Sequence, residues 1–315
     1  MRTPISSPDG TPISRFTFGT MQFGGRADAK ASREMFDACL EAGINHFDTA
    51  YVYTDGASET LLGEFAAPLR DRLVIATKAA YKGGSGRKNI LQAFDTSRQR
   101  LDMDSVDILY LHRFDPETPL EETYDTLAEL KQQSKIRHIG VSNHAAWQVM
   151  KSVAVAAECG LTIDILQPMY NLVKRQAEVE LLPMAKDQGI LVAPYSPLGG
   201  GLLTGKYGGI DDKSTVGRLA EDSRYHARYG QAWMWTAANA LSEVAKREGV
   251  SAATLAVAWV AAHPNKVSPI LSARSAEQLV PSLEAINYTL SDEMYQEITA
   301  LSPTPAPATD RLEEV

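Results

Sequence analysis

Short apolar segments rich in β-forming residues recur along this chain, and one amphipathic segment separates most neighbouring pairs. They read as continuous apolar runs rather than as strict alternation, which is typical of parallel strands buried on both faces. Apolar residues at three- and four-residue spacing, as around Met35, Phe94 and Leu127, predict the helices between them. The eight predicted strands are RFTFGT at 15–20, followed by NHFDTA, RLVIATK, VDILYLH, IRHIGVSN, IDILQPMYN, ILVAPYS and SPILSAR.

Eight strands, nearly all followed by a helix at a period of roughly 30 residues, predict an α/β fold of the (β/α)8 TIM-barrel type. The alternative is a doubly wound open sheet, which usually carries a G-x-G-x-x-G turn after its first strand. Here GTMQFGG follows RFTF and lacks that spacing. No linker divides the chain, so we expect one domain over residues 1–315.

Three segments lie outside the βα rhythm. Residues 1–14 contain Asp9-Gly10 between β-prone stretches, which predicts an N-terminal hairpin able to plug the bottom of the barrel. The long gap from Tyr195 to Lys266 predicts a glycine-rich loop, a charged loop reaching Arg228 and two helices over the C-terminal mouth. The Pro/Ala-rich tail, 302–315, is expected to be loosely ordered or to fold across the site.

Composition narrows the class of protein. With a net charge of −8 and no Lys/Arg-rich run, a nucleic-acid or membrane partner is not expected. The longest uncharged apolar stretch, Ala252 to Ala262, falls well short of the roughly 20 residues that span a bilayer. The polar N-terminus lacks the apolar core of a signal peptide, so we expect a cytoplasmic protein. Cys39 and Cys159 lie in helical patterns and are expected to be small buried hydrophobes rather than a disulfide.

Polar residues end the apolar strands one after another. In a barrel, functional side chains gather at the C-terminal ends of strands. Each residue alone has a structural explanation, since a single His such as His112 is most often a satisfied interior group. Together they predict a ring of polar groups at one mouth, made of Gly19, Thr20, Asp48 with Tyr53, Lys78, His112, Ser142, Asn143, Gln167, Tyr195 and Ser196.

Four of these residues fit one chemistry. Asp48 and Lys78 end neighbouring strands, so we expect them to pair and to keep the ammonium charged despite burial. Tyr53 would hydrogen-bond to that ammonium, and a nearby cation lowers the pKa of a phenol from about 10. Such a phenol can donate a proton to a developing alkoxide, while His112 polarises the carbonyl. The set contains no nucleophile placed to attack, so the electrons must come from elsewhere.

The strand-end motifs resemble those of the aldo-keto reductases. All six stand in family order and spacing, and the resemblance runs from Phe18 to about Leu290. It implies NADPH-dependent reduction of aldehydes and ketones, reversible in principle and without a metal, on a TIM barrel. The motifs are DTAYVY at 48–53, VIATK ending at Lys78, DILYLHRFD around His112, GVSN at 140–143, LQPMYN around Gln167 and YSPLGGGLLTGKY at 195–207.

The resemblance also implies a role for each matching residue. Tyr53 would donate the proton, Lys78 and Asp48 would tune its acidity, and His112 would orient the carbonyl. Further residues would hold the cofactor. Gly19 and Thr20 would approach the nicotinamide ribose. Ser142, Asn143 and Gln167 would hold the carboxamide, and Tyr195 would stack on the ring. The loop that contains Ser196, Pro197, Leu198, Gly200, Leu202 and Lys206 would wrap the pyrophosphate.

The segment that begins at Ser272 would meet the adenosine end of the cofactor. Arg274 and Gln278 would sit there, with Arg274 suited to bidentate contact with a 2′-phosphate. Two positions depart from the family pattern. Ser272 stands where relatives often have glycine, and Ser282, after Pro281, stands where an asparagine that would bind adenine is common. Both departures bear on adenine binding.

Other candidates and functions stay open at this stage. GGSGRK at 83–88 fits no phosphate-loop spacing, and the histidines and cysteines show no zinc pattern. One alternative function is a cofactor-bound regulatory subunit resembling potassium-channel β subunits, ranked second because no long inactivating segment precedes the first strand. Another is an aldolase with Lys78 as a Schiff-base nucleophile.

The substrate and the oligomeric state, a homo-oligomer included, are not decided by the sequence. Aromatic residues around the expected mouth suit an aromatic or medium-length aldehyde, whereas Arg224 and Arg228 suit an acidic carbonyl compound. Arg113 and Tyr51 are further candidates for substrate contact, and the aromatic set is Tyr225, Tyr229, Trp233 and Trp235.

Overall fold

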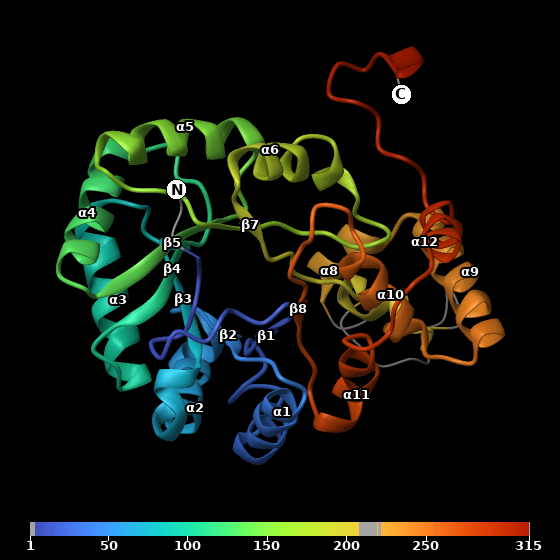
Figure 1. Cartoon of the computed structure of the whole chain (residues 1–315), viewed down its shortest axis with the longest axis horizontal. Helices are drawn as coiled ribbons and strands as arrows, with labels where there is room; N and C mark the ends of the chain where they lie inside the picture. The colour runs from blue at the N-terminus through green and yellow to red at the C-terminus, as the bar shows by residue number, and fades with distance from the viewer. Residues whose placement is uncertain (1–3, 208–218, 220–221, 315) are drawn as a thin grey trace.

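Eight parallel strands form one sheet in the order β7-β6-β5-β4-β3-β2-β1-β8. The structure is a computed structural model, which describes residues 4–207, 219 and 222–314 (Figure 1). The strands are β1 (Thr17–Gly19), β2 (His46–Asp48), β3 (Val74–Ala79), β4 (Val106–Leu111), β5 (Ile136–Ser142), β6 (Ile165–Gln167), β7 (Leu191–Val192) and β8 (Ile270–Leu271).

The sheet closes on itself between its first and last members. The Ser268 N–H donates to the Val192 carbonyl at 2.7 Å, and the Ile270 N–H donates to the Pro194 carbonyl at 2.9 Å. These two bonds join the β8 segment to the β7 segment. The predicted (β/α)8 barrel is therefore confirmed.

Helices surround the strands as an outer ring (Figure 1). The first shows how local sequence sets such a helix, because the Asp28 carboxylate accepts the Ala31 N–H at 2.8 Å at its start, while Met35 and Cys39 bury its inner face. The α-helices are α1 (Ala29–Glu41), α2 (Ala57–Ala66), α3 (Arg87–Leu101), α4 (Leu120–Gln132), α5 (Ala146–Glu158), α6 (Leu181–Gln188), α8 (Ser223–Tyr229), α9 (Ala232–Glu248), α10 (Ala252–Ala261), α11 (Ala276–Glu284) and α12 (Asp292–Thr299). Short 3-10 helices are η1 (Tyr53–Gly56), η2 (Ala67–Arg72), η3 (Gln176–Glu178), η4 (Gly199–Thr204) and η5 (Leu312–Glu314).

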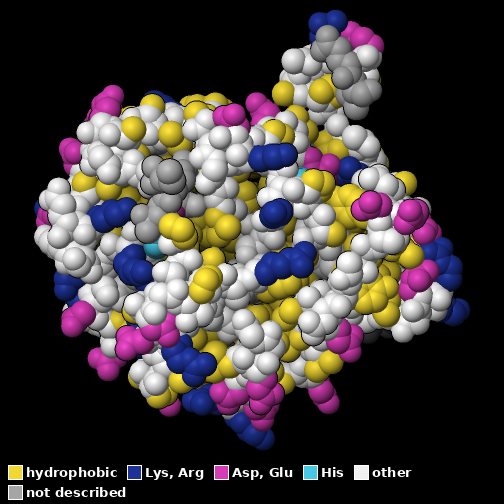
Figure 2. All heavy atoms as spheres, in the orientation of Figure 1, with side chains coloured by type: hydrophobic (Ala, Val, Ile, Leu, Met, Phe, Trp, Pro, Cys, Tyr) yellow, Lys and Arg dark blue, Asp and Glu magenta, His cyan; other side chains and the backbone are white. Residues whose placement is uncertain are grey.

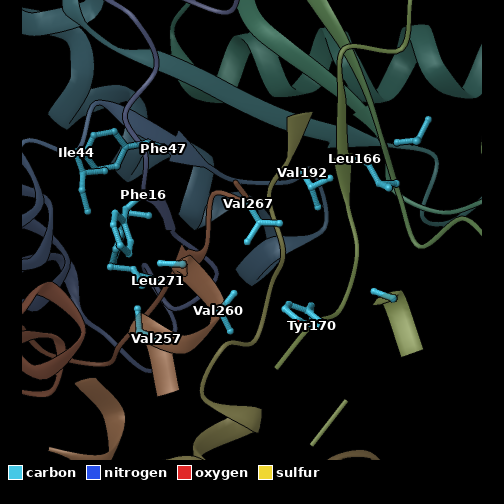
Figure 3. Close-up of a cluster of buried hydrophobic side chains, with 14 of the residues drawn as sticks. Phe16, Ile44, Phe47, Leu166, Tyr170, Val192, Val257, Val260, Val267 and Leu271 are labelled. Atoms are coloured by element: carbon cyan, nitrogen blue, oxygen red, sulfur yellow. The ribbon is translucent and has the colours of Figure 1, made fainter. Parts of the chain in front are cut away.

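Two apolar cores stabilise the barrel. The larger fills the space between strands and helices and includes Phe47, Leu271 and Val260 (Figure 3). The smaller fills the barrel interior and includes Tyr110. Gly140 on β5 gives that ring its place, because a Cβ at this position would lie 2.3 Å from the Tyr110 Cδ1 atom.

The N-terminal hairpin closes the bottom of the barrel, as the sequence predicts. Ser6 and Pro12 form an antiparallel bridge, and the Ile13 N–H donates to the Ile5 carbonyl at 3.1 Å. The Ile5 side chain belongs to the interior cluster, and Ile13 packs against it.

On the face drawn in Figure 2, basic and acidic side chains are scattered rather than gathered in one patch of either charge.

Three expectations need correction. The charged segment before Arg228 is not all loop, since it contains α8, which the Asp222 carboxylate caps by accepting the Arg224 N–H at 3.0 Å. Between Tyr195 and Lys266 the described residues thus hold α8, α9 and α10 rather than two helices, while 208–218 and 220–221 lie outside the description.

The C-terminal tail leaves the body of the molecule and does not fold across it (Figure 1). Cys159 is only partly buried, because it stands at the end of α5, where its thiol donates to Asp125 Oδ1 at 3.3 Å. Cys39 is buried as expected, and both thiols are free. None of the described helices has the length and apolar character needed to cross a bilayer.

Candidate active site

A buried ion pair lies at the C-terminal ends of β2 and β3. Asp48 is in register with Ala76, which places Lys78 two residues further along the neighbouring strand. The Lys78 Nζ atom lies 2.5 Å from Asp48 Oδ2 and also donates to the Thr49 carbonyl at 2.7 Å. Burial lowers the pKa of Lys78 and raises the pKa of Asp48, and the attraction between the two groups opposes both shifts. The expected pairing is present.

Asp48 is also held from across the barrel. Gln167 at the end of β6 donates through Nε2 to the second carboxylate oxygen, Asp48 Oδ1, at 3.1 Å. The Ser142 hydroxyl donates to the Gln167 carbonyl at 2.9 Å and so fixes the neighbouring strand end. Both oxygens of the carboxylate are therefore engaged.

Tyr53 and His112 lie against this pair. The Lys78 Nζ atom is 5.0 Å from the centroid of the Tyr53 ring, and the His112 ring meets the Tyr53 ring edge-on at 5.8 Å between centroids. The four residues that the sequence predicts as a set are thus brought together. A hydrogen bond from the Lys78 ammonium to the Tyr53 hydroxyl oxygen stays a prediction.

His112 is neutral at physiological pH. Burial lowers its pKa to about 3, and the positive charges of Lys78 and Arg113 lower it further. Its backbone N–H donates to the Ala79 carbonyl at 2.9 Å, which fixes the residue at the end of β4. Among the residues that the structure describes, the buried Nδ1 atom has no hydrogen-bond partner. A neutral imidazole in this position can donate a hydrogen bond to a substrate oxygen without adding charge.

Backbone strain gathers in the loops of the same mouth. Thr54, Ala80, Asn143 and Ser196 have φ values of 45°, 63°, 55° and 61°, and they follow β2, β3, β5 and β7. Residues other than glycine adopt this left-handed conformation at a cost, and such residues concentrate at functional sites.

Asn143 joins three strand ends into one rim. Its Nδ2 donates to the His112 carbonyl at 3.0 Å, and its Oδ1 accepts the Tyr195 hydroxyl at 2.7 Å. Burial raises the pKa of Tyr195 to about 12, so this phenol stays protonated and keeps donating. The groups predicted to hold a nicotinamide carboxamide are thus already ordered next to the catalytic set.

The residues after β1 lie deeper than the resemblance suggests. Thr20 is fully buried, and its hydroxyl contacts Ser58 Oγ at 2.8 Å and the Asp48 carbonyl at 3.2 Å. The backbone of Thr20 is engaged as well, since its N–H donates to the Asp48 carbonyl at 2.9 Å and its carbonyl accepts the Phe23 N–H at 2.9 Å. Gly19 is required for packing, since a Cβ there would lie 2.9 Å from Ile270 Cγ2 on β8.

The glycine-rich turn after β7 has a left-handed backbone. Gly199, Gly200 and Gly201 have φ values of 57°, 67° and 102° in succession. At Gly200 a Cβ would lie 2.7 Å from the ring of Tyr225 on α8, so the turn and that helix are in close contact. Four other predicted residues lie in the segment that contains this turn. Leu202 and Pro197 are buried, whereas Leu198 is half-buried and Lys206 is exposed.

The predicted adenosine end follows β8. Among the described residues, the Ser272 hydroxyl is buried without a hydrogen-bond partner, and the Gln278 side chain accepts the Arg274 N–H at 3.4 Å. A buried hydroxyl of this kind fits a polar group of a bound dinucleotide, which would supply the missing partner. Ser282 is buried in α11, so its side chain packs inside the protein.

Comparison with known proteins identifies the family. The Aldo/keto reductase family matches residues 15–303. The chain belongs to this family. Aflatoxin B1 aldehyde reductase member 2 from Homo sapiens is 37% identical over 289 residues, which cover 85% of this chain and 80% of that protein. L-glyceraldehyde 3-phosphate reductase from Escherichia coli (strain K12) is 33% identical over 303 residues, covering 88% and 85%.

A third relative carries a different kind of name. The probable voltage-gated potassium channel subunit beta from Oryza sativa subsp. japonica is 33% identical over 314 residues, covering 93% of this chain and 94% of that protein. The family and its reductase members make this aldo/keto reductase an oxidoreductase that acts on carbonyl compounds.

Several substrate candidates from the sequence are engaged elsewhere in this aldo/keto reductase. Arg224 is held in two bonds by the Asp222 carboxylate, at 3.0 and 2.7 Å. Tyr229 is fully buried, and Trp235 donates to its carbonyl at 2.9 Å. The mouth is therefore less aromatic than the sequence suggests.

Sequence reasoning also missed residues near the aldo/keto reductase site. Tyr81 lies 4.8 Å from the His112 ring, and the Arg113 guanidinium lies 5.2 Å from the Tyr81 ring centroid. Glu59 does not end a strand and so is not among the predicted site residues, yet it is fully buried and its negative charge raises the pKa of Lys78. The signal that could have identified Glu59 is a carboxylate on the apolar face of a helix.

Proposed function

We propose that this chain is an NADPH-dependent reductase of aldehydes or ketones in which Tyr53 donates the proton. The buried Asp48–Lys78 pair beside the Tyr53 ring is the observation that carries the proposal. An ammonium next to a phenol favours release of its proton, and that release is what a developing alkoxide needs. The neutral His112 imidazole would hold the carbonyl oxygen in place.

NADPH would supply the hydride. The chain's own residues would bind and orient it: Ser142, Asn143 and Gln167 at the carboxamide, Tyr195 at the ring, the 196–206 loop at the pyrophosphate, and Arg274 with Gln278 at the adenosine end. The orphaned Ser272 hydroxyl and the left-handed glycines support this assignment. The reaction would need no metal and would occur in the cytoplasm. The whole chain would form a single domain.

Two arginines at the rim favour an acidic carbonyl substrate. The Arg228 guanidinium lies 5.1 Å from the Tyr225 ring and lowers the pKa of Tyr195, whose value burial raises. Arg113 follows His112 directly and stacks on Tyr81. The protein as a whole carries a net charge of −8, so these two arginines depart locally from its overall charge. A positive rim on an acidic protein concentrates anionic substrates.

Tyr53→Phe tests the chemical role. NADPH oxidation is followed with a panel of aldehydes, ketones and sugars, and NADPH binding is measured by fluorescence titration. We expect the variant to lose roughly 10²–10⁴-fold in turnover, because it removes a general acid, while NADPH binding stays close to wild type. Wild-type-like turnover in the variant would contradict the proton-donor role.

Arg274→Ala tests the preferred cofactor. Loss of a bidentate contact to a 2′-phosphate is expected to weaken NADPH by about 10-fold or more and to leave NADH nearly unchanged. The measurement is the dissociation constant of each nucleotide for both proteins. Equal weakening of both nucleotides would rule out the 2′-phosphate contact.

The second candidate function is a channel-associated subunit. The relative from Oryza sativa subsp. japonica that bears this name aligns over 93% of this chain, which is the observation in its favour. Gel filtration followed by capture from detergent-solubilised membranes separates the two functions. Stable association with a membrane protein, together with slow turnover on the whole panel, would favour the subunit.

A further inference from the structure

A second charged layer lies directly behind the Asp48–Lys78 pair. Glu59 on α2 is fully buried, and its Oε1 accepts the hydroxyl of Thr77, the residue before Lys78, at 2.6 Å. Its Oε2 accepts from Arg100 Nη1, which reaches in from α3, at 3.2 Å. A carboxylate buried this deeply persists only when it is paired and hydrogen-bonded, and here both oxygens have partners.

Arg100 links this carboxylate to the loop that carries Tyr53. The same Nη1 atom donates to the Tyr51 carbonyl at 2.8 Å, and the guanidinium lies 4.9 Å from the centroid of the Tyr51 ring. From the other side, the Tyr51 N–H donates to the Lys78 carbonyl at 3.2 Å. The loop is therefore clamped between α3 and β3, immediately before Tyr53.

Gly56 shows that room for Arg100 is built into this loop. A Cβ at Gly56 would lie 2.4 Å from the Arg100 Nε atom, and the residue has a φ of 99°. The two residues before it, Thr54 and Asp55, also have positive φ values. Strain of this kind persists only where surrounding contacts hold the backbone. The Arg100 contacts provide such a hold.

Glu59 acts on Lys78 through charge as well as through Thr77. Burial lowers the pKa of Lys78, whereas the negative charges of Asp48 and Glu59 raise it. Glu59 therefore favours the ammonium that the proposed chemistry needs. The titratable groups around Lys78 are His46 and Asp48 on β2, Tyr53 in η1, Glu59 on α2, and Tyr110 and His112 from the β4 segment.

We propose that Glu59 and Arg100 are positioning residues for carbonyl reduction. Glu59 supports the charged form of Lys78, and Arg100 fixes the loop that presents Tyr53. The inference rests on the proposed function of the same site, and it adds two residues from helices outside the strand-end ring.

Glu59→Gln tests the charge and keeps the shape of the side chain. We expect kcat to fall by ~10-fold and the alkaline limb of the kcat/KM profile to move about one pH unit lower, because Lys78 loses a stabilising negative charge. NADPH affinity should not change. The matched control is Glu64→Gln, which removes an exposed carboxylate from the same helix and should match wild type.

Arg100→Lys and Arg100→Met test the clamp. Both lose the guanidinium that bridges Glu59 and the Tyr51 carbonyl and lies over the Tyr51 ring, so kcat should fall by ~5-fold or more in each, while KM for the carbonyl substrate changes little. The alkaline limb should not move to lower pH, because Glu59 keeps its charge. These variants also decide the clamp if Glu59→Gln does not fold.

A titration of Lys78 in the enzyme without substrate separates this inference from the proposed function. Isotope-labelled lysine lets NMR follow the ammonium directly, and Lys78 should titrate at lower pH in Glu59→Gln than in wild type. An unchanged titration and pH profile in Glu59→Gln, or an equal change in Glu64→Gln, would overturn the inference. If the wild type reduces no carbonyl compound, the proposed function fails while the titration still decides the role of Glu59.

Discussion

The two ends of the barrel each bury a carboxylate against a base, yet the two carboxylates are surrounded differently. At the bottom, Asp107 lies 2.9 Å from Arg70 and 2.8 Å from Arg137, and it also accepts the Ile75 N–H at 2.8 Å. At the mouth, Asp48 has one cation, Lys78, and one amide donor. The bottom cluster has two guanidinium groups, which stay charged at any pH the protein survives. The mouth has a lysine, whose protonation responds to its surroundings.

This difference shows how one pairing serves two purposes. Arg137 also donates to the Ser6 carbonyl at 2.7 Å, so the Asp107 cluster fastens the N-terminal hairpin to the barrel. Lys78 instead lies against a phenol and an imidazole with an unpartnered nitrogen. The Asp107 cluster therefore stabilises the fold. The Lys78 ammonium has one carboxylate partner and lies beside a proton donor, so it is available for chemistry.

Removing one carboxylate at each end gives the largest expected contrast. Asp48→Asn should lower kcat/KM by ~100-fold or more, because it leaves Lys78 without its charge partner. Asp107→Asn should lower the free energy of unfolding by about 1–3 kcal/mol, since two half-buried guanidinium groups lose their charged hydrogen-bond acceptor, and should leave turnover close to wild type. Steady-state kinetics and urea unfolding measure the two effects. A large loss of turnover in Asp107→Asn would break the comparison.

Acid should destabilise the fold through three buried histidines. Burial lowers the pKa of His46 and His112 to about 3 and that of His144 to about 4, from an ordinary 6.5. The unfolded chain therefore binds more protons than the folded one as the pH falls through 6.5, and stability decreases with falling pH. Each histidine contributes about 1.4 kcal/mol per pH unit in this range. Urea unfolding between pH 7 and pH 5 checks the slope, which should become shallower in His144→Gln.

The smallest effect is expected at the rim of the mouth. Arg228→Met should raise KM for a carboxylated aldehyde by roughly 3–5-fold and leave a neutral aldehyde of similar shape unaffected, because exposed charges contribute little. Arg224→Met is the matched control, since Asp222 already holds that guanidinium. Equal changes for both aldehydes would show that the rim does not select for charge.

The sequence predicts features that depend on local pattern. The apolar strands are buried on both faces, and Asp48, Lys78 and His112 mark their ends, so the barrel and the catalytic set follow from order and spacing. The Asp9-Gly10 turn likewise predicts the hairpin. The contacts of Glu59 and Arg100 do not follow, because they join residues 41 positions apart on two helices.

Charged residues were the least predictable. Arg224 and Arg228 look alike in sequence, but only the fold shows that Asp222 occupies the first. Thr20 follows its strand as expected, yet Ser58 on α2 draws its hydroxyl away from the mouth. Helix α8 was not predicted because its polar composition resembles that of a loop. The contact of its Tyr225 with Gly200 joins distant parts of the fold and cannot be read from local sequence. These features depend on which elements become neighbours.

The hairpin at the bottom has a consequence for the chemistry at the other end. Ile5 belongs to the interior cluster that includes Tyr110, and the Lys78 Nζ atom lies 5.6 Å from the Tyr110 ring, so the hairpin supplies the floor beneath the candidate site. Solvent admitted from below would hydrate the lysine and weaken its hold on a proton-donating neighbour. The N-terminal hairpin thus helps to exclude water from the buried lysine.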